Sequence, residues 1–155
     1  AAKQAAELAE ENVYVVESKT APQGLAAVMV FNSSASPEEN FVNMQEVLGT
    51  VSTLEVTHAV RDTHIEGVEI KKDEFMGIRD GKIVVSNLSL NTVLEELLEK
   101  SIDEDKEIVT IYLGEESTDE YTDFLEKLIE DKYPDVEVEL VESGQPVYPY
   151  IIGLE

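Results

Sequence analysis

The chain has 155 residues, of which 43% are hydrophobic, and its formal net charge is −23, from 34 acidic and 11 basic residues. This length suits one globular domain, whereas the charge excludes nucleic acid and anionic lipid surfaces as partners and favours a basic partner. No apolar run has the length of a membrane span, and the lack of cysteine excludes disulfides, thiolate nucleophiles and cysteine-type zinc sites and agrees with a cytoplasmic location.

The chain opens with residues that are helical by composition. Residues 2–11 predict a helix with Asn12 as its C-cap. Because the chain starts inside this helix and without methionine, we interpret residues 1–12 as the end of a helix from a preceding region, and the whole as a C-terminal fragment of a longer chain. The apolar run 13–16 then predicts a short strand that is buried on both faces.

Two helix starts follow. Thr20 and Pro22 fit an N-cap and a first helical turn, and residues 25–31 are apolar all round, so this short helix should be buried. Ser36 and Glu39 form a capping box that predicts a second helix. The first helix start lacks the glycine pattern and the lysine of phosphate-binding loops, so we interpret it as a structural turn.

The central stretch 53–86 predicts the strands around which the other elements are organised. β-branched runs alternate there with polar residues. Asp80 and Gly81 separate two of these runs, which is a strong signal for a tight β-hairpin.

The last third predicts a helix followed by a strand–helix–strand unit and a final strand. Two strands joined by a helix are expected to be parallel, whereas the hairpin at Gly81 must be antiparallel. The expected elements are a helix capped by Ser89 or Asn91, a strand over 108–113, a helix from Ser117 or Thr118, and strands over 136–141 and 148–154.

These elements together predict the fold class. We expect an α/β or α+β sandwich, in which helices pack on a mixed β-sheet with an antiparallel hairpin near Gly81. No repeat or low-complexity linker interrupts the chain, so residues 1–155 are predicted to form a single domain.

Arg61, Asp62, Thr63 and His64 form the first candidate site. Asp62 and His64 have the residue types of an acid–base pair, and Thr63 is a weak nucleophile. The competing interpretation is that Asp62 and Thr63 satisfy turn backbone groups while Arg61 pairs locally. Because no nucleophile elbow, kinase signature or oxyanion loop accompanies them, we predict no catalytic residue and take all four as candidate partner-binding residues.

The terminal segment is the second candidate site. Tyr148 and Tyr150, stiffened by Pro146 and Pro149, offer an aromatic surface that suits an interface. With Gln145 before them, we take Gln145, Tyr148 and Tyr150 as further candidate partner-binding residues. The alternative is an edge strand whose prolines stop further pairing.

No metal site is expected. The two histidines, His58 and His64, are six residues apart and do not share a helical face. Without cysteine, a metal site would need carboxylates, which are plentiful but unpatterned. His58 is best interpreted as a satisfied histidine within a strand.

Several blocks, in order along the chain, resemble the kinase component of bacterial fatty acid kinases, the FakA family. The turn at 17–27 reads ESKTAPQGLAA, and residues 57–63 and 67–72 read THAVRDT and GVEIKK. Residues 80–83 read DGKI, and residues 144–151 read GQPVYPYI, which is similar to the C-terminal signature of the family. The resemblance covers nearly all of the chain.

The resemblance implies a division of labour. In the family, an N-terminal DhaL-like domain binds ATP and Mg²⁺, so no cofactor is expected on these 155 residues. The kinase phosphorylates the carboxylate of a fatty acid held by a separate DegV-like carrier, FakB. The resemblance thus implies a non-catalytic domain that docks a FakB-type carrier, which would present a basic face, and it is compatible with a homodimeric parent.

The last third also resembles the DegV-like carriers themselves. Those carriers place a histidine after the glycine turn, at the carboxylate of the fatty acid, whereas residues 144–148 contain none. An acyl- or small-ligand-binding domain is therefore the alternative function. An enzyme that uses Asp62 and His64 is the third.

Overall fold

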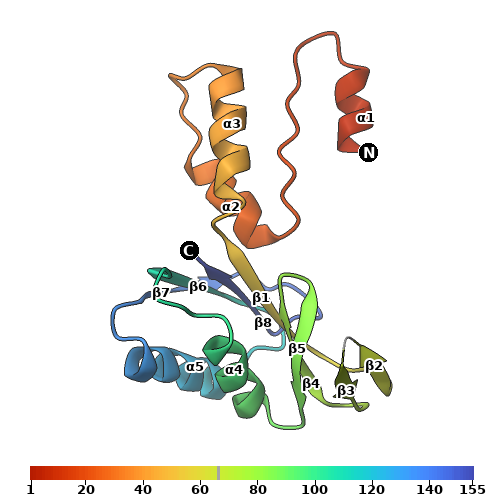
Figure 1. Cartoon of the computed structure of the whole chain (residues 1–155), viewed down its shortest axis with the longest axis vertical. Helices are drawn as coiled ribbons and strands as arrows, with labels where there is room; N and C mark the ends of the chain where they lie inside the picture. The colour runs from red at the N-terminus through yellow and green to blue at the C-terminus, as the bar shows by residue number, and fades with distance from the viewer. Residues whose placement is uncertain (66) are drawn as a thin grey trace. The chain divides into compact units, whose positions relative to one another are not determined.

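The computed structural model describes residues 1–65 and 67–155 (Figure 1). The chain divides into two compact units, residues 1–51 and residues 52–155. A single domain over residues 1–155 stays a prediction. Among the described residues, every helix is too short or too polar to cross a bilayer.

The first unit contains the helices α1 (Ala2–Glu7), α2 (Ala21–Met29) and α3 (Pro37–Val47). As predicted, the Thr20 hydroxyl accepts a hydrogen bond from the Gln23 amide at the start of α2. The predicted capping box at α3 is also present, because Ser36 Oγ accepts from the Glu39 amide and Glu39 Oε2 accepts from the Ser36 amide.

Three expectations for the first unit are wrong. The first helix ends at Glu7 with Leu8 as its C-cap, and not at Asn12. Residues 13–16 form no strand, since the described residues offer their backbone no sheet partner. Helix α2 is not buried all round: only Pro22, Ala26 and Ala27 are buried, and its larger apolar side chains are exposed.

The second unit is built on a six-stranded mixed sheet in the order β5-β4-β1-β8-β6-β7. All neighbouring strands are antiparallel except β6 and β7, which are parallel as predicted for a strand–helix–strand unit. A separate two-stranded ribbon is formed by β2 and β3. The strands are β1 (Ser52–His58), β2 (Thr63–Ile65), β3 (Val68–Ile70), β4 (Phe75–Arg79), β5 (Lys82–Asn87), β6 (Ile108–Leu113), β7 (Glu137–Glu142) and β8 (Tyr150–Leu154).

The β4–β5 hairpin confirms the signal in the sequence. Asp80 and Gly81 have φ angles of 49° and 81°, the left-handed pair that a tight two-residue turn requires. The Asp80 carboxylate also accepts hydrogen bonds from the Thr53 amide at 2.8 Å and from the Ser52 hydroxyl at 3.0 Å. The turn is thereby bound to the start of β1.

The core of the second unit lies between the sheet and the helices α4 (Leu90–Glu99) and α5 (Asp119–Lys132). Ser89 and Thr118 cap these helices, in agreement with the sequence. Large side chains of both helices are fully or almost fully buried in this core, namely Leu94, Leu97, Leu98, Leu125 and Ile129. The predicted fold class, helices packed on a mixed sheet, is therefore confirmed.

The last two strands differ from expectation in their surroundings. β8 is not an edge strand, because it lies between β1 and β6 and pairs with both. Pro146 and Pro149 do not block this pairing since they precede the strand. β7, like β5 at the other side of the sheet, is an edge strand, and its Leu140 and Val141 are both exposed.

Candidate functional site

Of the four residues of the first candidate site, Arg61 and Asp62 lie on the connection that follows β1, and Thr63 and His64 begin β2 of the ribbon. Arg61, Asp62 and His64 are exposed, and Thr63 is half-buried. The Asp62 carboxylate accepts a hydrogen bond from the Lys72 amide at 2.7 Å. Asp62 therefore satisfies a backbone group, as the structural interpretation expects, and in the described part of the chain no hydrogen bond joins it to His64.

An open hollow lies on this ribbon. Its volume is about 440 Å³, and it is lined by Asp62, Thr63, His64, Glu69, Ile70 and Lys71. The lining combines both charges, a hydroxyl and an imidazole, and it is open to solvent. Such a surface can recognise polar groups of a partner, but it does not enclose a reacting centre.

The ribbon is anchored to the main sheet by the turn before β4. Glu74 Oε2 accepts hydrogen bonds from the Lys71 amide at 2.9 Å and from the Ser86 hydroxyl of β5 at 2.7 Å. The amide bond lowers the pKa of the Glu74 carboxyl, and the Ser86 bond lowers it further. The amides of Asp73 and Ala59 complete the anchor with bonds of 2.8 Å, to the carbonyls of Ala59 and Glu74 respectively.

The second candidate segment forms a closed turn. The Gln145 side-chain amide donates to the carbonyls of Tyr112 at 3.1 Å and Tyr148 at 3.0 Å, and its oxygen accepts from the Ser143 hydroxyl. A Cβ added at Gly114 would lie 2.2 Å from the Tyr148 carbonyl oxygen, so only glycine permits this close approach. Gln145 and Tyr148 are both half-buried, and Gln145 braces the turn.

Tyr150 does not lie on the surface. Its side chain is 0% exposed. Its hydroxyl accepts from the Thr118 amide at 3.3 Å, donates to the Thr118 carbonyl at 3.2 Å, and lies 3.3 Å from the Thr122 hydroxyl. Tyr150 thus packs against the start of α5, where a partner could not contact it without rearrangement.

The structure brings the two candidate segments to the same end of β1. The Thr57 hydroxyl donates to the Val147 carbonyl at 2.9 Å, which ties the closed turn to β1 just before residues 61–64. Two exposed valines at this end, Val60 and Val147, were not predicted. Their signal in the sequence is weak, because single apolar residues are common on protein surfaces and the residue type alone does not reveal exposure.

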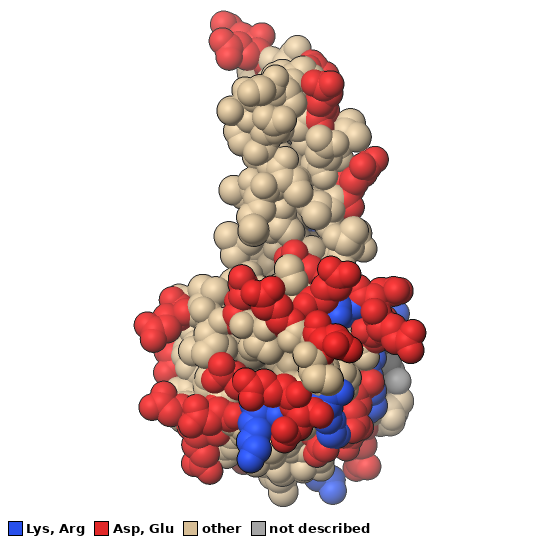
Figure 2. All heavy atoms as spheres, turned by 90° about the vertical axis from the view of Figure 1, so that its left-hand side faces the viewer, with Lys and Arg blue, Asp and Glu red and all other residues tan. Residues whose placement is uncertain are grey.

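The acidic residues, which have no pattern in the sequence, gather on the outward side of α5 and the turn before it. The carboxylates there belong to exposed residues: Glu115, Glu116, Asp119, Glu120, Asp123, Glu130 and Asp131. We call this set the α5 acidic surface. Figure 2 shows that acidic residues greatly outnumber basic ones on the face of the second unit that it draws.

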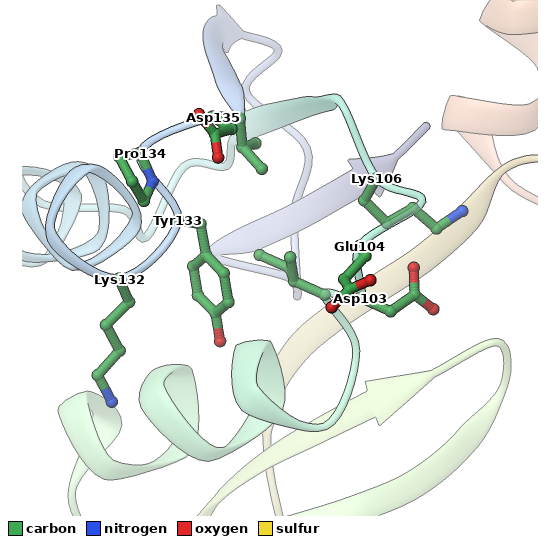
Figure 3. A pocket seen from close by; sticks show the side chains of 9 residues that line it. Asp103, Glu104, Lys106, Lys132, Tyr133, Pro134 and Asp135 are labelled. Carbon is green, nitrogen blue, oxygen red and sulfur yellow. The ribbon is translucent and has the colours of Figure 1, made fainter.

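A second hollow, of about 340 Å³, lies where the loop before β6 meets the loop after α5 (Figure 3). Its lining is mixed, with apolar side chains such as Tyr133 and Val136 beside three carboxylates and Lys106, while the Lys132 side chain turns away toward α4. Lys132 Nζ lies 2.7 Å from Glu95 Oε1 and 2.6 Å from Glu99 Oε1 of α4, and these hydrogen bonds raise the pKa of Lys132. Within residues 1–65 and 67–155, no group of three or more histidine, aspartate or glutamate side chains is arranged so that it could hold a metal ion.

Comparison with known proteins assigns the chain to a family. A family model for the C-terminal region of FakA-like fatty acid kinase proteins matches residues 1–155. An uncharacterized protein from Staphylococcus epidermidis is 42% identical over 155 residues, which are 100% of this chain and 28% of that protein. An uncharacterized protein from Staphylococcus aureus strain USA300 has the same identity and coverage. The chain thus spans little more than a quarter of the curated relatives it matches.

Solved structures show the same fold at low sequence identity. A DegV family protein from Corynebacterium glutamicum has 18% identity and a TM-score of 0.71, over 98% of this chain and 67% of that chain. A DegV family protein from Ruminococcus gnavus, described with vaccenic acid, has 15% identity and a TM-score of 0.65, over 96% of this chain and 62% of that chain.

Proposed function

Because this chain belongs to the FakA-like C-terminal family of fatty acid kinase proteins, we propose that it is a non-catalytic domain that docks an acyl-carrying protein of the DegV type. In this proposal, phosphate transfer takes place in the cytoplasm on another part of a longer polypeptide, which would hold ATP and Mg²⁺. The family match over residues 1–155 is the observation that carries the proposal.

The charge of the second unit supports a docking role. The carboxylates of the α5 acidic surface are exposed, so their field extends into solvent and would attract a carrier with a basic face. Such attraction increases the association rate and orients the partner before contact. It requires no catalytic residue on this chain.

The closed turn at residues 143–148 also supports docking over ligand binding. In a DegV-type carrier, a side chain after the glycine turn would have to reach the carboxylate of the acyl chain. Here the Gln145 amide already donates to two backbone carbonyls, and Gly114 lies against the same turn. The turn therefore offers no spare donor from Gln145 to a carboxylate head group.

The docking proposal is tested by titrating the natural polypeptide with its carrier. We expect a Kd of about 1 μM at about 20 mM salt, and at least about tenfold weaker binding at about 300 mM salt, because salt screens exposed charges. Reversing Glu120, Asp123 and Glu130 to lysine should weaken binding by a similar factor. The matched control reverses Glu7, Glu10 and Glu11, which changes the net charge equally but leaves the α5 acidic surface intact. If the polypeptide failed to bind the carrier at low salt, docking would be refuted. If both triple variants lost the same amount of affinity, the location of docking on the α5 acidic surface would be refuted.

A substitution of the exposed Arg61 tests whether residues 61–64 belong to the docking surface. In the same titration, Arg61→Ala should weaken carrier binding while leaving ATP binding by the natural polypeptide unchanged. If Arg61→Ala left the affinity for the carrier unchanged, residues 61–64 would not belong to the docking surface.

Acyl binding by this chain itself is the competing function, and the DegV-like fold is the observation that favours it. However, Leu94, Leu97, Leu98, Leu125 and Ile129 already fill the space between the sheet and the helices. We therefore expect saturating oleate to leave the melting temperature unchanged. A rise of several degrees, or a lipid extracted from the purified protein, would favour acyl binding instead.

A further inference from the structure

Helix α2 presents an apolar surface without a partner among the described residues of the first unit. Leu25, Val28 and Met29 lie at the i, i+3 and i+4 positions that share one helical face, and their exposed fractions are 48%, 64% and 82%. The helix contains no charged residue, and Phe31 just after it is 57% exposed. A surface helix normally turns polar side chains outward, so this face has the composition of a buried contact.

Residues 13–16 are a second element, one that pairs with no strand among the residues that the structure describes. They read Val-Tyr-Val-Val, the composition of a strand buried on both faces, yet Val13 and Tyr14 are exposed. The segment is held beside α3, because the Tyr14 hydroxyl donates to Glu38 Oε1 at 2.6 Å and its ring lies 5.4 Å from that of Phe41. Its backbone has no strand neighbour in the part of the unit that the structure describes.

The order of residues 13–16, the turn at Thr20 and α2 is typical of a strand–helix–strand unit. An extended apolar segment, a turn capped by Thr20 and the helix α2 make up the first half of a strand–helix–strand unit. In such a unit, the strand pairs with parallel neighbours and the helix covers the sheet with its apolar face. Here the exposed face and the unpaired segment are the two surfaces that a sheet would cover.

The helices of the first unit bury few of their own side chains. No residue of α1 is buried, and α3 buries only Asn40. Helix α2 buries Pro22 and two alanines. A unit of this size rarely has a sufficient core by itself, so more polypeptide is needed to bury the apolar residues.

We propose that residues 13–16 become a β-strand, and that Leu25, Val28 and Met29 become buried, on a β-sheet supplied by the polypeptide that precedes this region in its natural protein. The family model is that of a C-terminal region, and the matched stretch is only 28% of the relatives' length, so such relatives contain ample preceding chain. The contact is within one polypeptide. It is independent of the docking proposal, which concerns the second unit.

Hydrogen exchange on the natural polypeptide tests the strand. We expect the amides of residues 13–16 to exchange at least about 100-fold more slowly there than in the 155-residue chain, at any protein concentration. Exchange at the same rate in both would overturn the proposal. A natural polypeptide that begins at residue 1 would also overturn it, as would protection that appears only at high concentration, since that outcome assigns the surface to a second copy.

Two matched variants test the helix face. In the natural polypeptide, Met29→Glu should lower the melting temperature of the first unit by several degrees, because a carboxylate would be placed in the buried contact. Leu88→Glu is the control, since Leu88 is 72% exposed in the second unit and would stay in solvent. The same Met29→Glu change in the 155-residue chain should have no effect. Equal melting temperatures for the two variants of the natural polypeptide would overturn the assignment of this face.

Discussion

At the residue scale, Tyr150 shows how a side chain that suits an interface can instead serve the interior. Its ring lies in the core, and its hydroxyl bonds with the Thr118 backbone and approaches Thr122. A tyrosine within a buried strand is tolerated when its hydroxyl finds such partners. The hydroxyl therefore joins the central strand β8 to the first turn of α5.

Removing this hydroxyl should destabilise the second unit. We expect Tyr150→Phe to lower the free energy of unfolding by about 1–2 kcal/mol, because the Thr118 amide and carbonyl lose a buried partner. Tyr148→Phe is the matched control, since the described structure shows no hydrogen bond to its hydroxyl, and it should change the free energy by less than about 0.5 kcal/mol. Urea unfolding of both variants measures these changes in the free energy of unfolding. Equal decreases in the two variants would contradict the role assigned to the Tyr150 hydroxyl.

At the element scale, the sequence predicts those features, such as helix caps and tight turns, that depend only on residues close together in the chain. The caps at Thr20, Ser36, Ser89 and Thr118 and the turn at Gly81 are local, because each needs only a few residues and their backbone groups. The fold class follows from the order of these elements.

Other features depend on residues far away in the chain and could not be predicted locally. Residues 13–16 have the composition of a strand, but a strand forms only where another strand pairs with it. β8 lies at the centre of the sheet because β1 and β6 both pair with it, which its own prolines and tyrosines do not reveal. Likewise, the candidate segments at 61–64 and 143–148 lie at the same end of β1, where the Thr57 hydroxyl donates to the Val147 carbonyl, 90 positions along the chain.

The anchor of the β2–β3 ribbon should depend on pH. The pKa of Glu74 is lowered, mainly by the bond from the Lys71 amide, so this bond is intact above the ordinary pKa of glutamate. It is lost as the pH falls through the lower pKa of the folded state, and its stabilisation is lost with it. We expect the NMR shift of the Lys71 amide to titrate below pH 4.5. In Glu74→Gln this titration should vanish, and its persistence would assign the effect to another carboxylate.

At the scale of the whole molecule, charge repulsion competes with individual ion pairs. The pairs that the structure describes, such as Lys3 with Glu17 and Lys132 with Glu95, join side chains that are a third or more exposed. Exposed pairs contribute little, whereas 34 acidic residues against 11 basic ones leave most carboxylates without a cation. Repulsion among like charges should therefore outweigh attraction within pairs at low ionic strength.

Salt should consequently stabilise this protein. Raising the salt concentration from about 10 mM to about 300 mM shortens the screening length from about 30 Å to about 6 Å, so repulsion between distant carboxylates fades while close pairs lose less. We expect the melting temperature of the second unit to rise by several degrees, as measured by circular dichroism. The variant with lysine at Glu120, Asp123 and Glu130 should melt higher at low salt and respond less to added salt, because it relieves the repulsion directly. Sodium chloride and tetramethylammonium chloride should act alike if screening is the cause. A melting temperature that fell with salt would mean that the ion pairs between α4 and α5 outweigh the repulsion.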